Sequence, residues 1–535
     1  MINNLKHNRI YLLLGLAWVV ALLIINPTGE FPLSDDWAYS QNVYHLSEKG
    51  ELYFSSWPGM TLIVQTLWGA FFCKVFGFSF LILRVSTIVL SIVTSVVFMS
   101  FVLKLTGKRK LALYSTFALL FTPLYLMQSM TFMTEIHFLT FFISALYCYY
   151  RFFQTEHIKY ILFAVVFVLL SILVRQTGLV LPIAFGVVWS ICKRFEIKSI
   201  VLSIVPIFVG LLVLYVYKTL RFEGQVEGAY TEFSELFKIF NDFDPFFIPV
   251  RLGVIAFYLS LFLLPMIVSV SFKGYTINKR RIILFFVISL FVTLCMYTAR
   301  NAFPTGNVIS TEGIGIKLLK DLTWGDNVNP LVGQWFINAL EIFLIIVMNY
   351  ILFFLCTRKS FTITAETKGV RLLQGMLVVS GLGYLVYLSL VGLFFDRYVL
   401  PLIFLGILFL VTMRISARGI KRGYVLVLIF GGVSTLLIHD NFSWNRARWG
   451  GIEYLTDKEN ISPNNIDGGF EFNGWHQTAP RGVDEESKKS WWFVDDDTYV
   501  VAAGDIEGFS LYKTLPYQTL LPYETDTLYI LKKIE

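Results

Sequence analysis

Long apolar runs separated by short polar breaks occupy most of the chain. A helix needs about 17–25 mainly apolar residues to cross a bilayer. Runs of this kind predict spanning helices at 10–26, 79–103, 111–128, 134–152, 160–174, 177–192, 199–218, 251–272, 281–298, 333–356, 371–394, 397–413 and 423–438. The pattern therefore indicates an all-α polytopic membrane protein with about thirteen transmembrane helices.

The apolar run 60–76 is the exception, and we expect it to lie flat on the outer membrane surface. If this run crossed the membrane, Lys104 and the basic residues that follow it would face outside. A flat helix suits the polar Gln65 and the charged Lys74, and 79–103 becomes the second span. The basic clusters between the later spans then share one side, which the positive-inside rule assigns to the cytoplasm together with the N-terminus.

The opposite side collects long polar segments, at 27–59, 219–250, 299–332 and from His439 onward. In the last of these, stretches of alternating polarity at 498–503 and 527–531 predict β-strands. We therefore predict a transmembrane catalytic domain, residues 1–438, and a small soluble α/β or β domain outside the membrane, residues 439–535. The composition of this tail favours a bacterial inner (plasma) membrane.

Composition supports the membrane assignment and narrows the function classes. The 535 residues are 56% hydrophobic and only 15% charged, whereas soluble proteins have about 25% charged residues. The net charge of +7 is spread over short clusters with no basic stripe, which argues against a nucleic-acid partner. All five cysteines lie in or beside apolar runs, so neither a disulfide framework nor a zinc motif is indicated.

Several ionisable residues fall at the outer ends of the predicted spans. They are Asp35 and Asp36 after the first span, Arg84 in the second, Glu135 and His137 at 134–152, Arg175 in the break at 174–177, and Asp396-Arg397-Tyr398 before the penultimate span. Charges at membrane depth are costly, so their presence indicates a function. A carboxylate can act as a general base, and arginines can bind a phosphate bidentately.

Each of these residues also has a structural interpretation. Arg84 could extend toward the membrane interface, and His137 is more simply a hydrogen-bonded interfacial histidine than a metal ligand. Asp396 and Arg397 could form a local ion pair, and Arg175 could be an exposed charge in a turn. Their common side is what favours one shared site.

The order of these features resembles the GT-C glycosyltransferases, in particular the branch of the protein O-mannosyltransferases and the lipid A aminoarabinose transferases. That family has an acidic motif after the first span, flat juxtamembrane helices, an arginine near the outer end of the next span, a second outer acidic residue and a late basic-Tyr-x-Leu-Pro element. The corresponding positions are Asp35-Asp36, residues 41–76, Arg84, Glu135 and Arg397-Tyr398-Val399-Leu400-Pro401. The resemblance covers about residues 10–413.

The resemblance implies an inverting transferase that moves a sugar from a polyprenyl-phosphate-linked donor to a glycan, lipid or protein acceptor at the outer membrane face. Its candidate catalytic residues are Asp35 as the base, Asp36 as a helper and Glu135, which would orient the acceptor. Its candidate donor-phosphate contacts are Arg84, Arg175, Arg397 and Tyr398, and its candidate acceptor contact is His137. No cofactor is certain; some relatives need a divalent cation, for which Asp35 and Asp36 are candidate ligands.

The sequence departs from the family pattern at one point, and two other function classes stay open. Several family members have a Lys-Pro-Pro-like element late in the first external loop, where this chain has Ser56-Trp57-Pro58-Gly59. A lipid-linked-glycan flippase or other secondary transporter would also carry ionisable residues in the membrane, although the two halves of the chain show no obvious repeat. A structural or assembly subunit would not require these charges to meet. The motif at 467–475, Asp-Gly-Gly-Phe-Glu-Phe-Asn-Gly-Trp, is similar to the tails of some bacterial members and assigns no substrate.

Overall fold

The computed structural model describes most of the chain, with gaps in several loops. The described residues are 2–55, 57–220, 246–271, 279–303, 309–310, 313–314, 332–357, 367–392, 394–413, 415–476, 483–484, 489–490, 494 and 496–534. Most of the predicted outer loops 219–250 and 299–332 lie outside this set, as does part of each basic cluster near 273 and 358.

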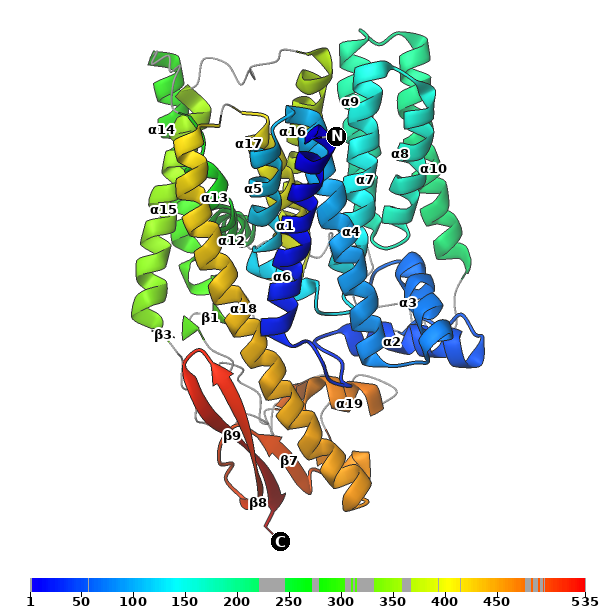
Figure 1. Ribbon diagram of the computed structural model, residues 1–535, viewed down its shortest axis with the longest axis vertical. Helices are drawn as coiled ribbons and strands as arrows, with labels where there is room; N and C mark the ends of the chain where they lie inside the picture. The colour runs from blue at the N-terminus through cyan, green and yellow to red at the C-terminus, as the bar shows by residue number, and fades with distance from the viewer. Residues whose placement is uncertain are drawn as a thin grey trace.

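Most of the described residues up to position 453 are helical, and the longer helices stand roughly upright beside one another (Figure 1). In the first half they are α1 (Ile2–Ile25), α2 (Asp36–Tyr44), α3 (Ile63–Phe76), α4 (Phe80–Thr106), α5 (Arg109–Leu120), α6 (Pro123–Gln128), α7 (Thr134–Thr155), α8 (Ile158–Ile172), α9 (Val180–Cys192) and α10 (Ile197–Leu220). In the second half they are α12 (Phe247–Phe262), α13 (Leu264–Ile267), α14 (Lys279–Thr298), α15 (Gln334–Thr357), α16 (Lys368–Leu390), α17 (Leu400–Val411), α18 (Ala417–Glu453) and α19 (Phe470–His476).

Helix covers most of each predicted span, although 111–128 is divided into α5 and α6 and the end of 251–272 lies outside the described residues. The multi-spanning architecture is confirmed. Within the described residues, seven helices are long and apolar enough to cross a membrane: α4, α7, α10, α14, α15, α16 and α18. The apolar helices α8, α9 and α12 are shorter, and α5 and α17 have 12 residues each. The count of about thirteen transmembrane helices stays a prediction.

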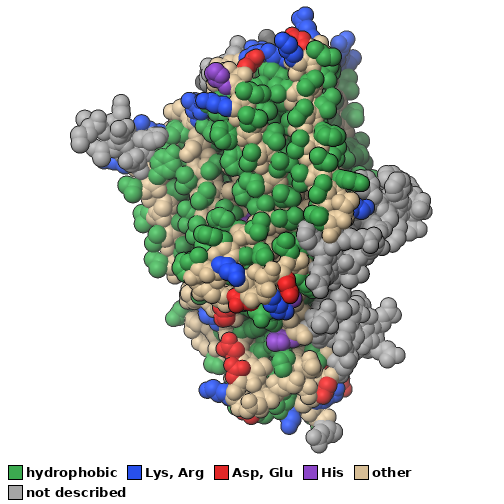
Figure 2. Space-filling model, turned by 90° about the vertical axis from the view of Figure 1, so that its right-hand side faces the viewer, with side chains coloured by type: hydrophobic (Ala, Val, Ile, Leu, Met, Phe, Trp, Pro, Cys, Tyr) green, Lys and Arg blue, Asp and Glu red, His purple; other side chains and the backbone are tan. Residues whose placement is uncertain are grey.

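The surface of the helical part matches a chain that lies in lipid. Figure 2 shows a broad zone of hydrophobic side chains on one face, with Lys and Arg gathered at the end where the chain begins. Large apolar residues of the helices, such as Leu23, Phe208 and Leu428, are more than half exposed. Apolar surface on this scale is typical of contact with a bilayer.

Helix α3 lies at the lower end of the bundle beside α2 and does not run through it (Figure 1). Its start is tied to the break after α8, because the backbone N–H groups of Leu62 and Val64 donate to the carbonyls of Val174 and Leu173, both at 3.3 Å. This position agrees with the expected juxtamembrane helix.

The C-terminal segment forms a small β-containing unit at the end of the molecule away from the N-terminus (Figure 1). Its sheet has the order β4-β7-β9-β8, and its strands are β4 (Ile466–Asp467), β7 (Tyr499–Ala502), β8 (Phe509–Leu520) and β9 (Tyr523–Lys533). The predicted strands at 498–503 and 527–531 correspond to β7 and β9. Shorter strands are β1 (Ile309–Ser310), β2 (Gly313–Ile314), β3 (Val332–Gly333), β5 (Val483–Asp484) and β6 (Lys489–Ser490).

Helix α18 connects this unit to the membrane part without a break. It has 37 residues and continues past position 438, which we took from the sequence as the end of the first domain. The Asp440 carboxylate accepts the backbone N–H groups of Leu520 (2.6 Å) and Leu521 (2.9 Å) at the turn of the β8–β9 hairpin. The same helix therefore carries both a candidate span and the anchor of the sheet.

Candidate active site

The loop after α1 is shaped by two charged side chains. Arg84 of α4 donates to the carbonyls of Pro27 (3.0 Å), Gly29 (2.8 Å) and Phe31 (2.5 Å). Glu30 caps the start of α4 by accepting the backbone N–H of Phe80 at 2.6 Å. An acidic group at a helix N-terminus is favourable because it meets unpaired N–H donors and the positive end of the dipole. The two contacts together fix the path of the chain up to Asp35.

Asp35 stands at the N-cap position of α2 but does not cap that helix with its side chain. Its Oδ2 accepts a hydrogen bond from Arg397 Nη2 at 2.7 Å, and its Oδ1 accepts one from Trp57 Nε1 at 3.0 Å. The carboxylate is thus directed away from its own helix and toward the neighbouring charged groups.

Glu135 supplies the second carboxylate, from the first turn of α7. Its Oε1 accepts a hydrogen bond from Arg175 Nη1 at 2.9 Å and lies 3.5 Å from Arg397 Nε. The Glu135 side chain is only 2% exposed. A buried carboxylate is stable only when paired, and these two arginines provide the pairing.

The arginines come from breaks between helices. Arg175 lies in the turn between α8 and the 3₁₀ turn Gln176–Leu179, and Arg397 lies in the 3₁₀ turn Asp396–Val399 just before α17. The Tyr398 ring lies under both guanidinium groups, at 4.8 Å from Arg175 and 5.6 Å from Arg397. Chain breaks at this level let long side chains reach the protein interior while the adjoining helices keep their hydrogen bonds.

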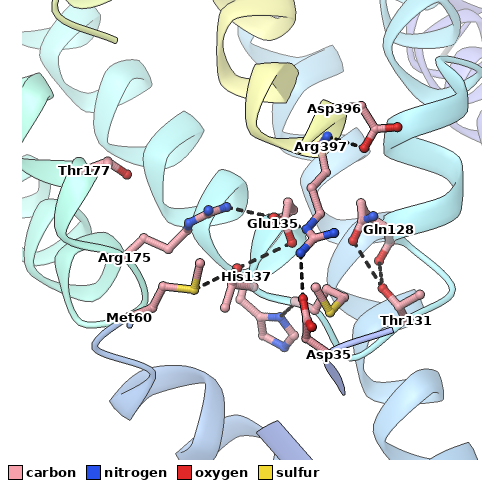
Figure 3. Close-up of polar contacts among 12 residues, drawn as sticks. Asp35, Met60, Gln128, Thr131, Glu135, His137, Arg175, Thr177, Asp396 and Arg397 are labelled. Carbon is pink, nitrogen blue, oxygen red and sulfur yellow. Dashed lines mark hydrogen bonds and ion pairs between the residues drawn. The ribbon is translucent and has the colours of Figure 1, made fainter. Parts of the chain in front are cut away.

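We call Asp35, Glu135, Arg175 and Arg397 the charge cluster (Figure 3). The sequence placed these residues on one side, and the structure brings them into contact as two carboxylates and two arginines. Asp35 is the most exposed, at 16%, and Arg397 and Arg175 are 9% and 6% exposed. Arg175 is therefore not an exposed turn charge. Asp396 does not pair with the Arg397 guanidinium; its Oδ1 accepts the backbone N–H of Arg397 at 2.6 Å.

Asp36, Arg84 and His137, which the sequence also predicts for the site, make their contacts outside the charge cluster. Both oxygens of Asp36 accept backbone N–H groups, from Leu33 at 2.5 Å and Phe132 at 3.1 Å. Burial raises the pKa of Asp36 to about 8, against the lowering effects of these N–H groups and of Arg84. Arg84 itself is held by the three loop carbonyls, so it neither extends to the interface nor reaches the charge cluster.

His137 lies one turn into α7, fully buried against the Phe132 ring. Its Nδ1 is 3.1 Å from the Met133 carbonyl, and its buried Nε2 has no hydrogen-bond partner. Figure 3 shows the imidazole below Glu135 with no polar contact to the charge cluster. Its role as an acceptor contact stays a prediction.

Sequence reasoning missed two residues that contact the Asp35 segment and a third that pairs with one of them. Trp57, noted only as a departure from the family pattern, donates directly to Asp35. Glu471 accepts the backbone N–H of Ser34 at 3.1 Å and is itself paired with Arg448 at 2.9 Å. Glu471 and Arg448 both lie in the tail. In the sequence, only the unusual 467–475 motif marked that region.

The candidate metal ligands Asp35 and Asp36 do not face a common point. Asp35 and Asp36 point to different partners, and the Asp36 oxygens are taken by backbone N–H groups. Among the residues that the structure describes, no three His, Cys, Asp or Glu side chains gather in a way that could hold a metal ion. The suggested divalent-ion site at Asp35-Asp36 therefore gains no support from the geometry.

Part of the chain is similar to a known protein family. Residues 63–220, from α3 to the end of α10, match the dolichyl-phosphate-mannose-protein mannosyltransferase family. Two crystal structures of ArnT from Cupriavidus metallidurans are similar over nearly the whole chain at 11% identity. The one bound to undecaprenyl phosphate has a TM-score of 0.40 and covers 98% of this chain and 97% of that one; the apo state has 0.36, 96% and 97%.

No curated protein sequence is significantly similar to the chain. The family match includes Arg84, Glu135, His137 and Arg175 and ends before Arg397. It agrees with the resemblance read from the order of the motifs, and the multi-spanning helical architecture is the one that resemblance implies. The comparisons therefore show a likeness of residues 63–220 to the dolichyl-phosphate-mannose-protein mannosyltransferase family.

Proposed function

We propose that the protein transfers a sugar from a polyprenyl-phosphate-linked donor to an acceptor at the outer membrane face, with inversion at the anomeric carbon. The observation that carries the proposal is the contact between Asp35 and Arg397 beside the buried Glu135–Arg175 pair. It joins a candidate base to candidate phosphate-binding groups within one cluster. The ArnT structure that contains undecaprenyl phosphate supports a lipid of the same chemical class.

Asp35 is the proposed base. It is the most exposed member of the charge cluster, so an acceptor can approach it more readily than Glu135. In the proposed step, the acceptor hydroxyl or amine attacks the anomeric carbon and its proton passes to the Asp35 carboxylate. A positioned base of this kind contributes typically ~10²–10⁴-fold to a rate.

Arg397 and Arg175 are the proposed contacts of the donor phosphate, with Tyr398 as the ring that orders both guanidinium groups. The bond between the anomeric carbon and the phosphate oxygen breaks, and the phosphate leaves with the bonding electrons. Arginines stabilise that developing charge because their N–H groups match two phosphate oxygens. We infer that the phosphate replaces Asp35 as the partner of Arg397, which frees the carboxylate to accept a proton.

Other residues have supporting roles in this proposal. Glu135 holds the two arginines in place and orients the acceptor. Asp36 helps indirectly, by fixing the turn from Leu33 to Asp35. Arg84 has the weakest support as a phosphate contact because three carbonyls already occupy it. His137 would contact the acceptor through its unpartnered Nε2.

The proposed topology places the N-terminus in the cytoplasm and the C-terminal unit, together with the charge cluster, on the extracytoplasmic side. The gathering of Lys and Arg at the N-terminal end of the bundle supports this orientation (Figure 2), because basic residues are retained on the cytoplasmic side. The acceptor would then be a component of the cell envelope, as glycan, lipid or protein.

Turnover of a panel of radiolabelled polyprenyl-phosphate sugars by the purified protein tests the proposal. We expect wild-type activity with at least one donor and a loss of about 10²-fold or more in Asp35→Asn. The matched control is Asp457→Asn, which changes an exposed carboxylate on the C-terminal unit. Undiminished turnover in Asp35→Asn would exclude Asp35 as the base. No turnover with any donor, together with movement of a lipid-linked sugar across vesicles, would favour a transporter.

A further inference from the structure

The tail of the chain reaches the loop that holds Asp35. Helix α19 lies directly below α2 in Figure 1, and the Gly474 backbone sits against the Trp37 indole so closely that a Cβ there would be 2.6 Å from Trp37 Cε2. Phe470 packs on the rings of both Trp37 (6.0 Å) and Trp57 (5.9 Å). One of these, Trp57, is the residue that donates to Asp35.

A polar contact accompanies this packing. Glu471 Oε1 accepts the backbone N–H of Ser34 at 3.1 Å, and Glu471 Oε2 accepts from Arg448 Nη1 at 2.9 Å. Both side chains are largely buried, Glu471 at 16% and Arg448 at 6% exposed. Because one carboxylate joins α18, α19 and the residue before Asp35, a movement of the tail changes the position of that residue.

The 467–476 segment is built to present Glu471 in this way. Asp467 Oδ1 accepts from the Gly469 N–H (3.1 Å) and from Asn473 Nδ2 (2.8 Å), while Asn473 Oδ1 accepts the Gly468 N–H at 3.1 Å. Arg448 Nε donates to the Gly468 carbonyl at 2.7 Å. Gly469 has φ +89°, and a Cβ there would lie 2.5 Å from Arg448 Nη2. Only glycine therefore fits this position beside the arginine.

Ser34 is the residue on which the contact acts. Its φ is +56°, a left-handed conformation that residues with a Cβ seldom adopt. Such a conformation persists when its surroundings hold it in place. The N–H that Glu471 accepts belongs to this residue, and Asp35 is the next residue along the chain.

We propose that Glu471 is a positioning residue for the active site: it holds Ser34 in its left-handed conformation so that Asp35 faces Arg397. The tail motif is thereby part of the catalytic unit and not only a covering domain. This inference rests on the proposed function, in which Asp35 is the base. Base geometry affects the chemical step more than donor binding, so the loss should lie in kcat and not in the donor KM.

The experiment uses the full-length protein in detergent with the most active donor of the panel. We expect Glu471→Ala to lower kcat by about 10–100-fold, the range for a catalytic group displaced by roughly an ångström, with little change in the donor KM. Lys533→Gln is the control, because it breaks an ion pair with Asp497 elsewhere in the tail and should keep wild-type kcat. Hydrogen exchange of the peptide that contains Ser34 should be faster in Glu471→Ala and unchanged in Lys533→Gln.

A second substitution separates positioning from a general loss of packing. Glycine adopts positive φ without a steric cost, so Ser34→Gly in the Glu471→Ala background should recover kcat by about fivefold or more. Wild-type kcat in Glu471→Ala, or no recovery on adding Ser34→Gly, would overturn the positioning role while the transferase stands. A wild-type chain inactive with every donor would overturn the proposed function itself.

Discussion

Arg397 and Asp35 are 362 positions apart in the chain, yet Arg397 Nη2 lies 2.7 Å from Asp35 Oδ2. The contact joins the first loop after α1 to the turn that opens α17. Neither residue has the pairing expected from local sequence, because Asp35 does not cap α2 and Arg397 does not pair with the neighbouring Asp396 side chain. The site therefore depends on tertiary packing between the two ends of the membrane part.

Substitution by lysine should affect donor binding at Arg397 but not at Arg84. We expect Arg397→Lys to raise the donor KM by about 10–100-fold, because a hydrogen bond to a charged group is worth about 1.5–3 kcal/mol and lysine cannot bind a phosphate bidentately. Steady-state kinetics with varied donor concentration measures this effect.

Arg84→Lys is the matched comparison. Lysine can keep part of the contact with the carbonyls of Pro27, Gly29 and Phe31, so we expect a lower unfolding temperature and an unchanged donor KM. A rise in KM for Arg84→Lys equal to that for Arg397→Lys would assign Arg84 to the donor phosphate after all.

Loss of one partner of the Glu135–Arg175 pair should destabilise the protein more than loss of both partners. Removal of one member of a buried ion pair costs about 3–5 kcal/mol, whereas replacing both with apolar residues of similar size is often neutral. We expect Glu135→Met to lower the unfolding temperature strongly, and Glu135→Met with Arg175→Met to regain most of that loss. Thermal unfolding in detergent measures both variants.

Transferase activity should not follow stability in these two variants. Both variants should be inactive, because the cluster loses the residues proposed to hold the donor and acceptor. If the double variant were less stable than wild type by the sum of the losses measured in Glu135→Met and in Arg175→Met alone, the pair would not be coupled.

The indole of Trp57 should matter through its N–H and not through its size. Trp57→Phe keeps an aromatic ring against Phe470 but removes the donor to Asp35 Oδ1. A lost hydrogen bond of this kind corresponds to about 1–3 kcal/mol, and we expect kcat to fall by about tenfold. Trp68→Phe likewise removes an indole N–H bond, to the Ser86 carbonyl, and keeps a ring against Phe72, so it should leave kcat close to wild type. Equal losses in both variants would assign the effect to packing.

Hydrophobic periodicity was sufficient to predict the helices and the order of the membrane part. Spans such as 79–103 and 199–218 coincide with α4 and α10 because membrane helices need long apolar runs, and α3 could be set apart because its Gln65 and Lys74 are costly in lipid. The sidedness of Asp35, Glu135, Arg175 and Arg397 followed from the same pattern, since each lies at the end of a predicted span that the positive-inside rule places outside.

Contacts that depend on tertiary packing could not be predicted. The Glu471–Ser34 bond joins segments 437 positions apart, and nothing in the sequence connects the 467–475 motif with the loop before Asp35. Asp36 and Asp35 are adjacent and chemically identical, so only the fold shows that one faces backbone N–H groups and the other faces Arg397. The end of α18 could not be predicted either, because hydropathy predicts only where the apolar run stops, near His439, and the helix continues to Glu453.

The proton on Asp36 should make the stability of the protein depend on pH. Burial raises the pKa of this carboxyl from 3.8 to about 8 in the folded protein, so the folded state binds a proton that the unfolded state releases above pH 4. Its contribution to stability is complete below that pH and is lost as the pH rises through 8, by on the order of 1 kcal/mol per pH unit. Asp36→Asn cannot titrate, so the stability of wild type relative to this variant should fall steadily from pH 5 to pH 8 and become constant above. Unfolding temperatures of both proteins across this range measure the difference, with Asp457→Asn as the control that follows wild type. Parallel curves for wild type and Asp36→Asn would show that Asp36 is ionised in the fold, held by the N–H groups of Leu33 and Phe132.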